Sequence, residues 1–352
     1  APPIRCGEQA RAGGASSPDM KSVLRVAVSI ATTLLGLLVV TFVISRMLPA
    51  DPVLAVVGDH ASESTIEAAR IRLGLDKPIL VQFWIYLTDV LRGDLGNSIR
   101  TNLPISQELA RVFPATLELA TLGTIIGIIV GIPLGVLAAI RKDTLIDHVV
   151  RFVGLIGYSV PIFWLGLMGL LILYFKLDWL PGPGRLDFGY EDLVTPVTGL
   201  MTVDTLIAGD MEMFRNALGH IIMPASLLGY FSLAYISRMT RSLMLGQLRQ
   251  EYILTARVKG VSETRVIWRH AMRNILVPLL TVIALSYGNL LEGSVLTETV
   301  FAWRGLGLYI TDSIFGQDMP AVLGGTIVVG AIFIIINMLT DVAYRVLDPR
   351  AK

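Results

Sequence analysis

Residues 251–260 read EYILTARVKG, and this stretch is the most informative part of the chain. It predicts a short helix that carries Arg257 and Lys259 and ends at Gly260, because glycine commonly terminates helices. Ser262 then predicts the start of a second helix. The tendency of cytoplasmic loops to be cationic explains the charge, but not the helix–glycine–helix arrangement. That arrangement predicts a rigid element on which a partner docks.

The composition around this stretch is that of a membrane protein. Of the 352 residues, 53% are hydrophobic and only 16% are charged, whereas soluble domains carry about 25% charged residues. The net charge of +1 gives no reason to expect a nucleic-acid partner. The four histidines are scattered without metal-ligand spacing, and no GxxxxGKS or GxxxxGKT phosphate loop occurs. We therefore expect no metal site, no catalytic residues and no ATP-hydrolysing machinery in this chain.

Six segments approach the length of about 20 apolar residues that a membrane-spanning helix needs. The fourth is the weakest, because it is short and contains Pro224 and Gly229. Together they predict an all-α integral membrane protein whose spans are residues 23–48, 116–140, 152–175, 220–235, 276–296 and 321–346.

Lysine and arginine residues indicate how these spans are oriented. They gather before the first span, after the second, after the fourth and after the sixth, which predicts that both termini are cytoplasmic. The cytoplasmic loop then covers residues 238–275, and the extracytoplasmic segments cover residues 49–113 and 176–219. Residues 1–19, rich in small residues, predict a disordered leader or a cloning remnant before one six-span domain of residues 20–352.

The first outer segment predicts two helices. Ser64 and Glu67 have the spacing of a capping box, and Gly74 predicts the end of that helix. Residues 79–92 predict a second helix, whose aromatic residues suit the membrane interface. The last outer loop is acidic and contains Glu298.

Two spans carry patterns beyond simple hydrophobicity. The second has a glycine at every fourth position, which predicts a groove that packs closely against another helix, either fixed or sliding. These glycines are Gly123, Gly127, Gly131 and Gly135. The fifth contains Ser286, Asn289 and Glu292, and an ionisable group at membrane depth usually faces protein or water. Glu292 therefore either lines a solvated pathway, where it could meet an amine, or accepts a hydrogen bond from a neighbouring helix.

Residues 252–260, followed by RHAMRN at 269–274 and by Pro278, resemble the coupling loop of binding-protein-dependent ABC importer permeases. The likeness is closest to the dipeptide/oligopeptide branch, and within it to the B-type subunit of dipeptide permeases. It covers essentially everything after Met20. The further blocks that agree are LPADP (48–52), LGLDKP (73–78), GDLG (93–96), SVPIFW (159–164), RMTRS (238–242), LTETVF (296–301) and DPR (348–350).

Three positions depart from the family pattern. Leu254, Thr255 and Ala256 stand where the wider importer motif begins Glu-Ala-Ala, so docking through that glutamate is not implied. Arg304 follows Trp303 where the branch usually has proline, and Ala50 replaces a glycine.

The resemblance implies a type I ABC importer permease fold in a bacterial inner membrane. It implies three kinds of protein partner beside the lipid bilayer: a second homologous permease subunit, two ATPase subunits and an extracytoplasmic peptide-binding protein. The chain itself is then non-catalytic and binds no cofactor, while the ATPases use ATP and Mg. The residues that it implies for ATPase coupling are Glu251, Tyr252, Thr255, Ala256, Arg257, Lys259 and Gly260.

Dipeptides and oligopeptides are the substrates that the resemblance favours. Branches that transport glutathione, nickel, opines or modified peptides share the coupling block, so the exact substrate stays open. A secondary transporter or a channel is the alternative from another class. Ion-linked transporters often have inverted repeats, and the sequence does not display any.

Overall fold

The computed structural model describes the backbone of residues 20–47, 61–72, 74–190 and 193–347, together with Val53 and Val57. The predicted leader, residues 1–19, lies outside the described residues, as do the blocks 48–52 and 348–350. The side chains of Lys21, Arg25 and Arg345, which contribute to the predicted orientation, also lie outside them.

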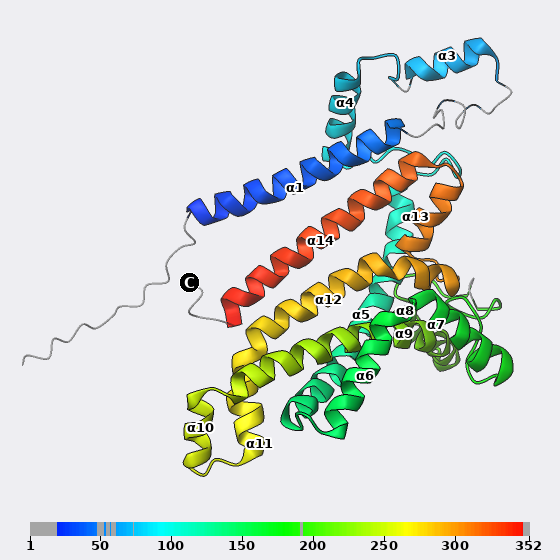
Figure 1. Ribbon diagram of the computed structural model, residues 1–352. Helices are drawn as coiled ribbons and strands as arrows, with labels where there is room; N and C mark the ends of the chain where they lie inside the picture. The colour runs from blue at the N-terminus through cyan, green and yellow to red at the C-terminus, as the bar shows by residue number, and fades with distance from the viewer. Residues whose placement is uncertain are drawn as a thin grey trace, which may run out of the picture.

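Long helices dominate the fold, and the described residues form no β-strand. In Figure 1, α1, α14, α12 and α9 lie in succession, each in contact with the next, and α5 packs on α9. Helices α10 and α11 project at one end, while α3, α4 and α13 lie at the other. The elements are α1 (Met20–Met47), α3 (Glu63–Arg72), α4 (Ile79–Leu91), α5 (Ile105–Ile140), α6 (Leu145–Ser159), α7 (Ile162–Gly169), η1 (Leu170–Lys176), α8 (Met201–Ile207), α9 (Met211–Leu248), α10 (Glu251–Val258), α11 (Glu263–Arg265), η2 (Val266–Ala271), α12 (Met272–Val300), α13 (Leu306–Phe315) and α14 (Met319–Leu347).

Four of the described helical segments are long and apolar enough to cross a membrane: α5, α9, the continuous segment Glu263–Val300, and Met319–Thr340 of α14. A fifth span results if α6 and the α7–η1 segment are taken together. The first predicted span corresponds to α1, whose described apolar part, Ala31–Ile44, is shorter than a span. The described residues therefore give four or five spans, and the sixth stays a prediction.

The third predicted span, residues 152–175, is not one straight helix. The chain bends by 99° between α6 and Ile162–Lys176. Pro161 explains the bend, because it lacks a backbone N–H and disfavours helical dihedral angles in the residue before it. Val160 is accordingly extended, with φ −96° and ψ 128°.

The fourth predicted span, residues 220–235, is too short, because α9 continues through Pro224 and has 38 residues. Asp210 stabilises its start by accepting hydrogen bonds from the N–H groups of Glu212 and Met213, at 2.9 and 3.0 Å. At the other end, the helix includes residues that were assigned to the cytoplasmic loop. The predicted cytoplasmic segment 238–275 therefore begins within α9, which extends to Leu248.

Two smaller predictions also need correction. Ser62, not Ser64, precedes α3, and its hydroxyl accepts a hydrogen bond from the N–H of Thr65 at 3.3 Å. Glu298 does not lie in an outer loop, because α12 extends to Val300 and buries it completely. Its carboxylate accepts hydrogen bonds from Thr116 Oγ1 of α5 at 2.6 Å and from the N–H of Leu308 in α13 at 2.9 Å.

The four repeated glycines of α5 face α9. A Cβ atom at Gly123 would lie 2.9 Å from Cβ of Leu228, and one at Gly135 would lie 2.5 Å from the carbonyl oxygen of Ser237. Equivalent atoms at Gly127 and Gly131 would collide with Ser232 and crowd Ile236. Glycine therefore permits the close approach of two helix backbones in the bundle.

Gly135→Ala is expected to lower the free energy of unfolding of the purified protein by about 1–3 kcal/mol, because overpacking forces the two helices apart. Gly246→Ala in α9 is the matched control, since a Cβ there meets no atom within 4 Å. Alanine should leave that helix unchanged or stabilise it by up to about 1 kcal/mol. Equal thermal unfolding midpoints for the two variants would contradict the close packing of α5 on α9.

Candidate functional site

The short helix α10 has the boundaries that its sequence predicts. It runs from Glu251 to Val258, and Gly260 follows in the left-handed region with φ +75°. The N–H of Val261 donates to the carbonyl oxygen of Ala256 at 3.1 Å, and the N–H of Gly260 donates to that of Arg257 at 2.9 Å. This pattern satisfies the last carbonyl groups of the helix and reverses the chain toward α11.

One face of α10 is part of the protein core. Ile253 is fully buried and Ala256 nearly so. They belong to one apolar cluster with Met244 of α9, Val266 of η2 and Ile275 of α12. Because interiors are close-packed, a force applied to α10 is transmitted to the ends of α9 and α12.

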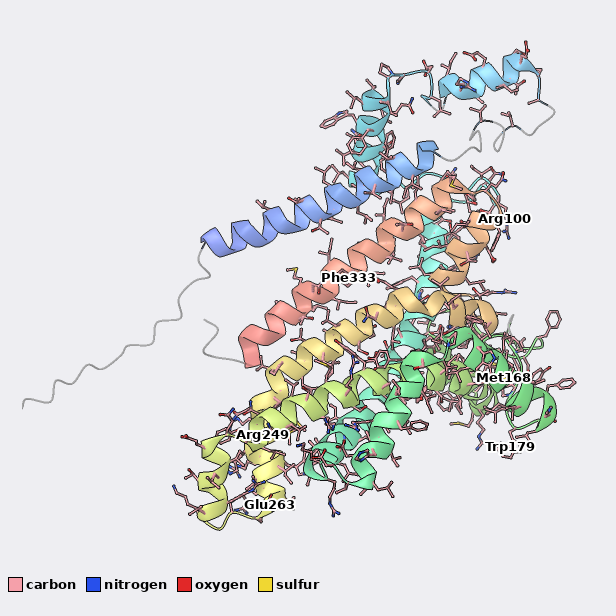
Figure 2. All side chains as sticks on the ribbon, viewed as in Figure 1. Arg100, Met168, Trp179, Arg249, Glu263 and Phe333 are labelled. Carbon is pink, nitrogen blue, oxygen red and sulfur yellow. The ribbon has the colours of Figure 1, made fainter. Side chains whose placement is uncertain are left out.

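The opposite face of α10 is exposed and carries two large apolar side chains. Leu254 is 63% and Val258 81% exposed, and their spacing of four residues puts them on one side of the helix. Glu251, Thr255 and Lys259 are also exposed. Figure 2 shows Arg249 and Glu263, which flank this face in the sequence, at the end of the molecule far from Arg100.

The predicted coupling residues differ in their surroundings. Glu251, Thr255 and Lys259 are exposed, whereas Ala256 points into the core and cannot contact a partner directly. Tyr252 donates a hydrogen bond to Gln247 Oε1 at 2.8 Å. The remaining two are Arg257, which pairs with Glu263, and Gly260, which forms the turn. Sequence reasoning missed Leu254 and Val258, although their four-residue spacing was visible.

A buried ion pair holds α6 against α9 at the base of this region. Arg241 donates from Nε and Nη2 to the two carboxylate oxygens of Asp147, at 2.6 and 2.7 Å. Asp147 is fully buried, and its Oδ2 also accepts the N–H of Asp143 at 3.0 Å. Such bidentate pairs fix geometry as well as adding energy.

The three polar residues predicted for a pathway do not share one face. The hydroxyl of Ser286 is buried and lies 2.9 Å from that of Ser232 in α9. Asn289 and Glu292 are exposed, together with Leu285 and Leu296, which follow the same spacing of three or four residues. Glu292 also lines a cavity to which α5, α13 and α14 contribute side chains.

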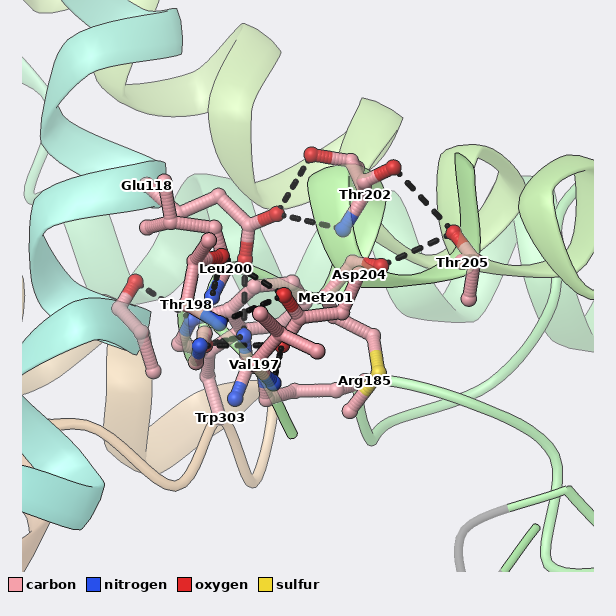
Figure 3. Close-up of polar contacts among 12 residues, drawn as sticks. Glu118, Arg185, Val197, Thr198, Leu200, Met201, Thr202, Asp204, Thr205 and Trp303 are labelled. Atoms are coloured by element: carbon pink, nitrogen blue, oxygen red, sulfur yellow. Dashed lines mark hydrogen bonds and ion pairs between the residues drawn. The ribbon is translucent and has the colours of Figure 1, made fainter. Parts of the chain in front are cut away.

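A second polar cluster fastens the outer segment to the bundle (Figure 3). Glu118 of α5 is buried, pairs with Arg185 at 2.8 Å and accepts the N–H and hydroxyl of Thr202 at 2.7 and 2.6 Å. Arg185 also lies over the ring of Trp303, 5.4 Å from its centroid. These contacts fasten the segment around Arg185 and the start of α8 to α5.

Asp204 holds the adjoining turn together. Its carboxylate accepts hydrogen bonds from the N–H and hydroxyl of Thr198, at 2.8 and 2.7 Å, and from the N–H of Gly199 at 2.9 Å. Burial raises the pKa of Asp204, but these hydrogen bonds outweigh burial and hold the pKa below its ordinary value. The carboxylate is therefore ionised at neutral pH and keeps the turn formed.

No group of three or more His, Cys, Asp or Glu side chains that could hold a metal ion occurs within the described part of the chain. The features that remain are helices for crossing a membrane, two exposed polar side chains on α12 and an exposed helix joined to the core. They define the class of a multi-pass membrane component that works with a partner at one end.

Family models identify this component. Residues 131–352 match the family described as binding-protein-dependent transport system inner membrane component, and residues 20–120 match its N-terminal part. The chain belongs to this family of bacterial inner-membrane proteins. It is thus a permease component of a transport complex that includes ATPase and substrate-binding partners.

Individual relatives cover almost the whole chain. The probable D,D-dipeptide transport system permease protein DdpB of Escherichia coli (strain K12) is 45% identical over 90% of this chain and 92% of its own length. The dipeptide transport system permease protein DppB of the same strain is 41% identical over 95% of this chain and 99% of its own length. The di/tripeptide transport system permease protein DppB of Pseudomonas aeruginosa (strain UCBPP-PA14) is 41% identical over 91% of this chain and 95% of its own length.

A solved structure supports the fold. The MetNI methionine ABC transporter, in inward-facing conformations, contains a chain that matches with a TM-score of 0.50 at 15% identity. The match covers 69% of this chain and 97% of that one. The predicted type I ABC importer permease fold is thereby confirmed.

Proposed function

We propose that this chain is one of two permease subunits in an ATP-driven importer of dipeptides or oligopeptides. A second, homologous permease completes the translocation unit, and two ATPase subunits bind the cytoplasmic ends of the pair. A peptide-binding protein delivers substrate to the other side of the membrane. The chain itself performs no chemistry.

The geometry of α10 is the observation that carries this proposal. Its inner face lies in the core beside α9 and α12, while Leu254 and Val258 project from its outer face. An exposed apolar patch on a charged background is typical of a protein–protein contact. In Figure 1, the start of α1 and the end of α14 lie at the same end as α10, which supports a common cytoplasmic side.

The proposed mechanism is alternating access driven from outside the chain. Closure of the ATPases moves α10 as a rigid body, and the buried face of α10 transmits this movement to α9 and α12. Asn289 and Glu292, which are exposed on α12, then line the space between the two permeases. Reversal after ATP hydrolysis releases the substrate inside.

The substrate assignment rests on the relatives, whose names specify dipeptides, D,D-dipeptides or di- and tripeptides. Reconstitution of the full complex in proteoliposomes tests it. Binding protein loaded with dipeptides should stimulate ATP hydrolysis and peptide uptake. The assignment fails if only glutathione, nickel or another small solute gives both responses.

Glu292→Gln is expected to reduce uptake of peptides with a free amino terminus by about two- to fivefold, because an exposed charge contact is worth about 0.2–1 kcal/mol. Acetylated peptides should be unaffected. Asp312→Asn, which removes an exposed carboxylate on α13, serves as the control. If Glu292→Gln imports both the free and the acetylated peptide as fast as wild type does, this carboxylate has no role in the pathway.

A further inference from the structure

The predicted coupling residue Arg257 does not point freely toward a partner. Its Nε donates to Glu263 Oε1 at 2.8 Å, and its Nη2 donates to Oε2 at 3.2 Å. This is the parallel two-bond geometry in which arginine recognises a carboxylate with defined orientation. Both carboxylate oxygens of Glu263 are therefore engaged by α10.

The pair bridges the turn that separates two helices. Arg257 lies in the last turn of α10, and Glu263 is the first residue of α11. Between them lies Gly260 with φ +75°, at which a Cβ atom would meet nothing within 4 Å. The turn is thus not packed against other residues at Gly260. The ion pair is a specific contact that connects the two helices across this turn.

Glu263 also begins the helical segment that leads into the membrane. Residues Glu263–Val300 form one continuous helical stretch that passes through the π-helical turn η2. Such π-helical turns are frequent at functional sites. The pair therefore links α10 to the base of the helix that carries Asn289 and Glu292.

We infer that Arg257 and Glu263 form a clasp that sets the angle of α10 relative to α12, and that Arg257 is a positioning residue rather than an ATPase contact. This inference rests on the proposed function. It adds that the movement of α10 reaches α12 through a defined side-chain pair as well as through the apolar cluster.

Charge reversal tests the clasp in the reconstituted complex. The readout is the number of peptides imported per ATP hydrolysed, which simple loss of folded protein does not change. Arg257→Glu and Glu263→Arg should each lower this ratio by up to about fivefold, in keeping with an exposed pair. The double variant, Arg257→Glu with Glu263→Arg, should restore it to near the wild-type value.

Arg249→Glu is the matched control, because Arg249 is an exposed cation just before α10 with no ion pair within the described residues. It should leave the ratio unchanged. A double variant as impaired as Arg257→Glu would mean that the guanidinium itself contacts the partner, which overturns the clasp. Normal ratios in both single variants would overturn it as well.

Leu254→Asp separates this inference from the proposed function. If α10 does not contact the ATPase at all, Leu254→Asp leaves transport unchanged. If the docking role holds and only the clasp fails, Leu254→Asp impairs transport while the reversed pair shows no rescue.

Discussion

Leu254→Asp combined with Val258→Asp is expected to abolish ATP-driven uptake while the chain still folds and inserts. Both side chains are largely exposed, so the substitutions disturb no internal packing. Hot-spot residues at the centre of an interface contribute about 2 kcal/mol or more, which corresponds to a loss of roughly 30-fold in affinity for each. We expect Leu254 and Val258 to be such residues, because they are the most exposed large apolar side chains of α10. A carboxylate in the apolar centre of the contact adds a desolvation cost.

The measurement is co-purification of the ATPase subunit with each variant, followed by uptake in proteoliposomes. Leu145→Asp provides the control, because Leu145 is 79% exposed and begins α6, a different element near the same end of the bundle. The Leu145→Asp variant should co-purify with the ATPase subunit and support normal peptide uptake. If the double variant binds the ATPase as tightly as wild type, the outer face of α10 is not the docking surface.

Arg241→Met is expected to produce a large loss of stability. It leaves the fully buried carboxylate of Asp147 without its cation. Removing one partner of a buried pair costs about 3–5 kcal/mol, because the remaining charge is neither paired nor hydrated. A sharp fall in the thermal unfolding midpoint of the detergent-purified protein, and in the amount in the membrane, should result.

Two comparison variants make this result specific. Replacing both residues, Arg241→Met with Asp147→Asn, removes the charges together and should recover most of the lost stability. Arg257→Met breaks a pair whose partners are 39% and 60% exposed, and should cost less than about 1 kcal/mol. A single Arg241→Met variant as stable as the double one would show that the pair does not hold α6 on α9.

The sequence was a good guide where local chemistry determines structure. Glycine after a short periodic segment predicts the end of α10, and the spacing of the α5 glycines predicts one packing face. Long apolar segments predict α12 and α14 to within about one helical turn at each end. They also predict the end of α5, which begins about three turns before the predicted span. In each case the signal lies within a single helix or turn.

Contacts between distant residues could not be predicted in this way. Asp147 and Arg241 are 94 residues apart, and Thr116 and Glu298 are 182 residues apart. Without the fold, Glu298 reads as an exposed loop residue and Ser286 as a companion of Glu292. Only the packing of α5, α9 and α12 buries Glu298 and turns Ser286 toward Ser232.

The burial of Ala256 also depends on contacts with residues distant in the sequence. The helical period puts Ile253 and Ala256 on one face and Leu254 and Val258 on another, but it does not say which face meets the core. Burial against Met244 and Ile275 decides this. The coupling surface that we propose is therefore centred on Leu254 and Val258 and not on Ala256.

A photocrosslinking residue at position 254 of the assembled complex tests the central claim most directly. We predict that it captures the ATPase subunit, whereas the same residue at position 80 does not. Leu80 is a suitable reference, because it is 79% exposed on α4, at the opposite end of the molecule. Failure to capture the ATPase from position 254, or equal capture from both positions, would contradict the assignment of α10 as the coupling helix.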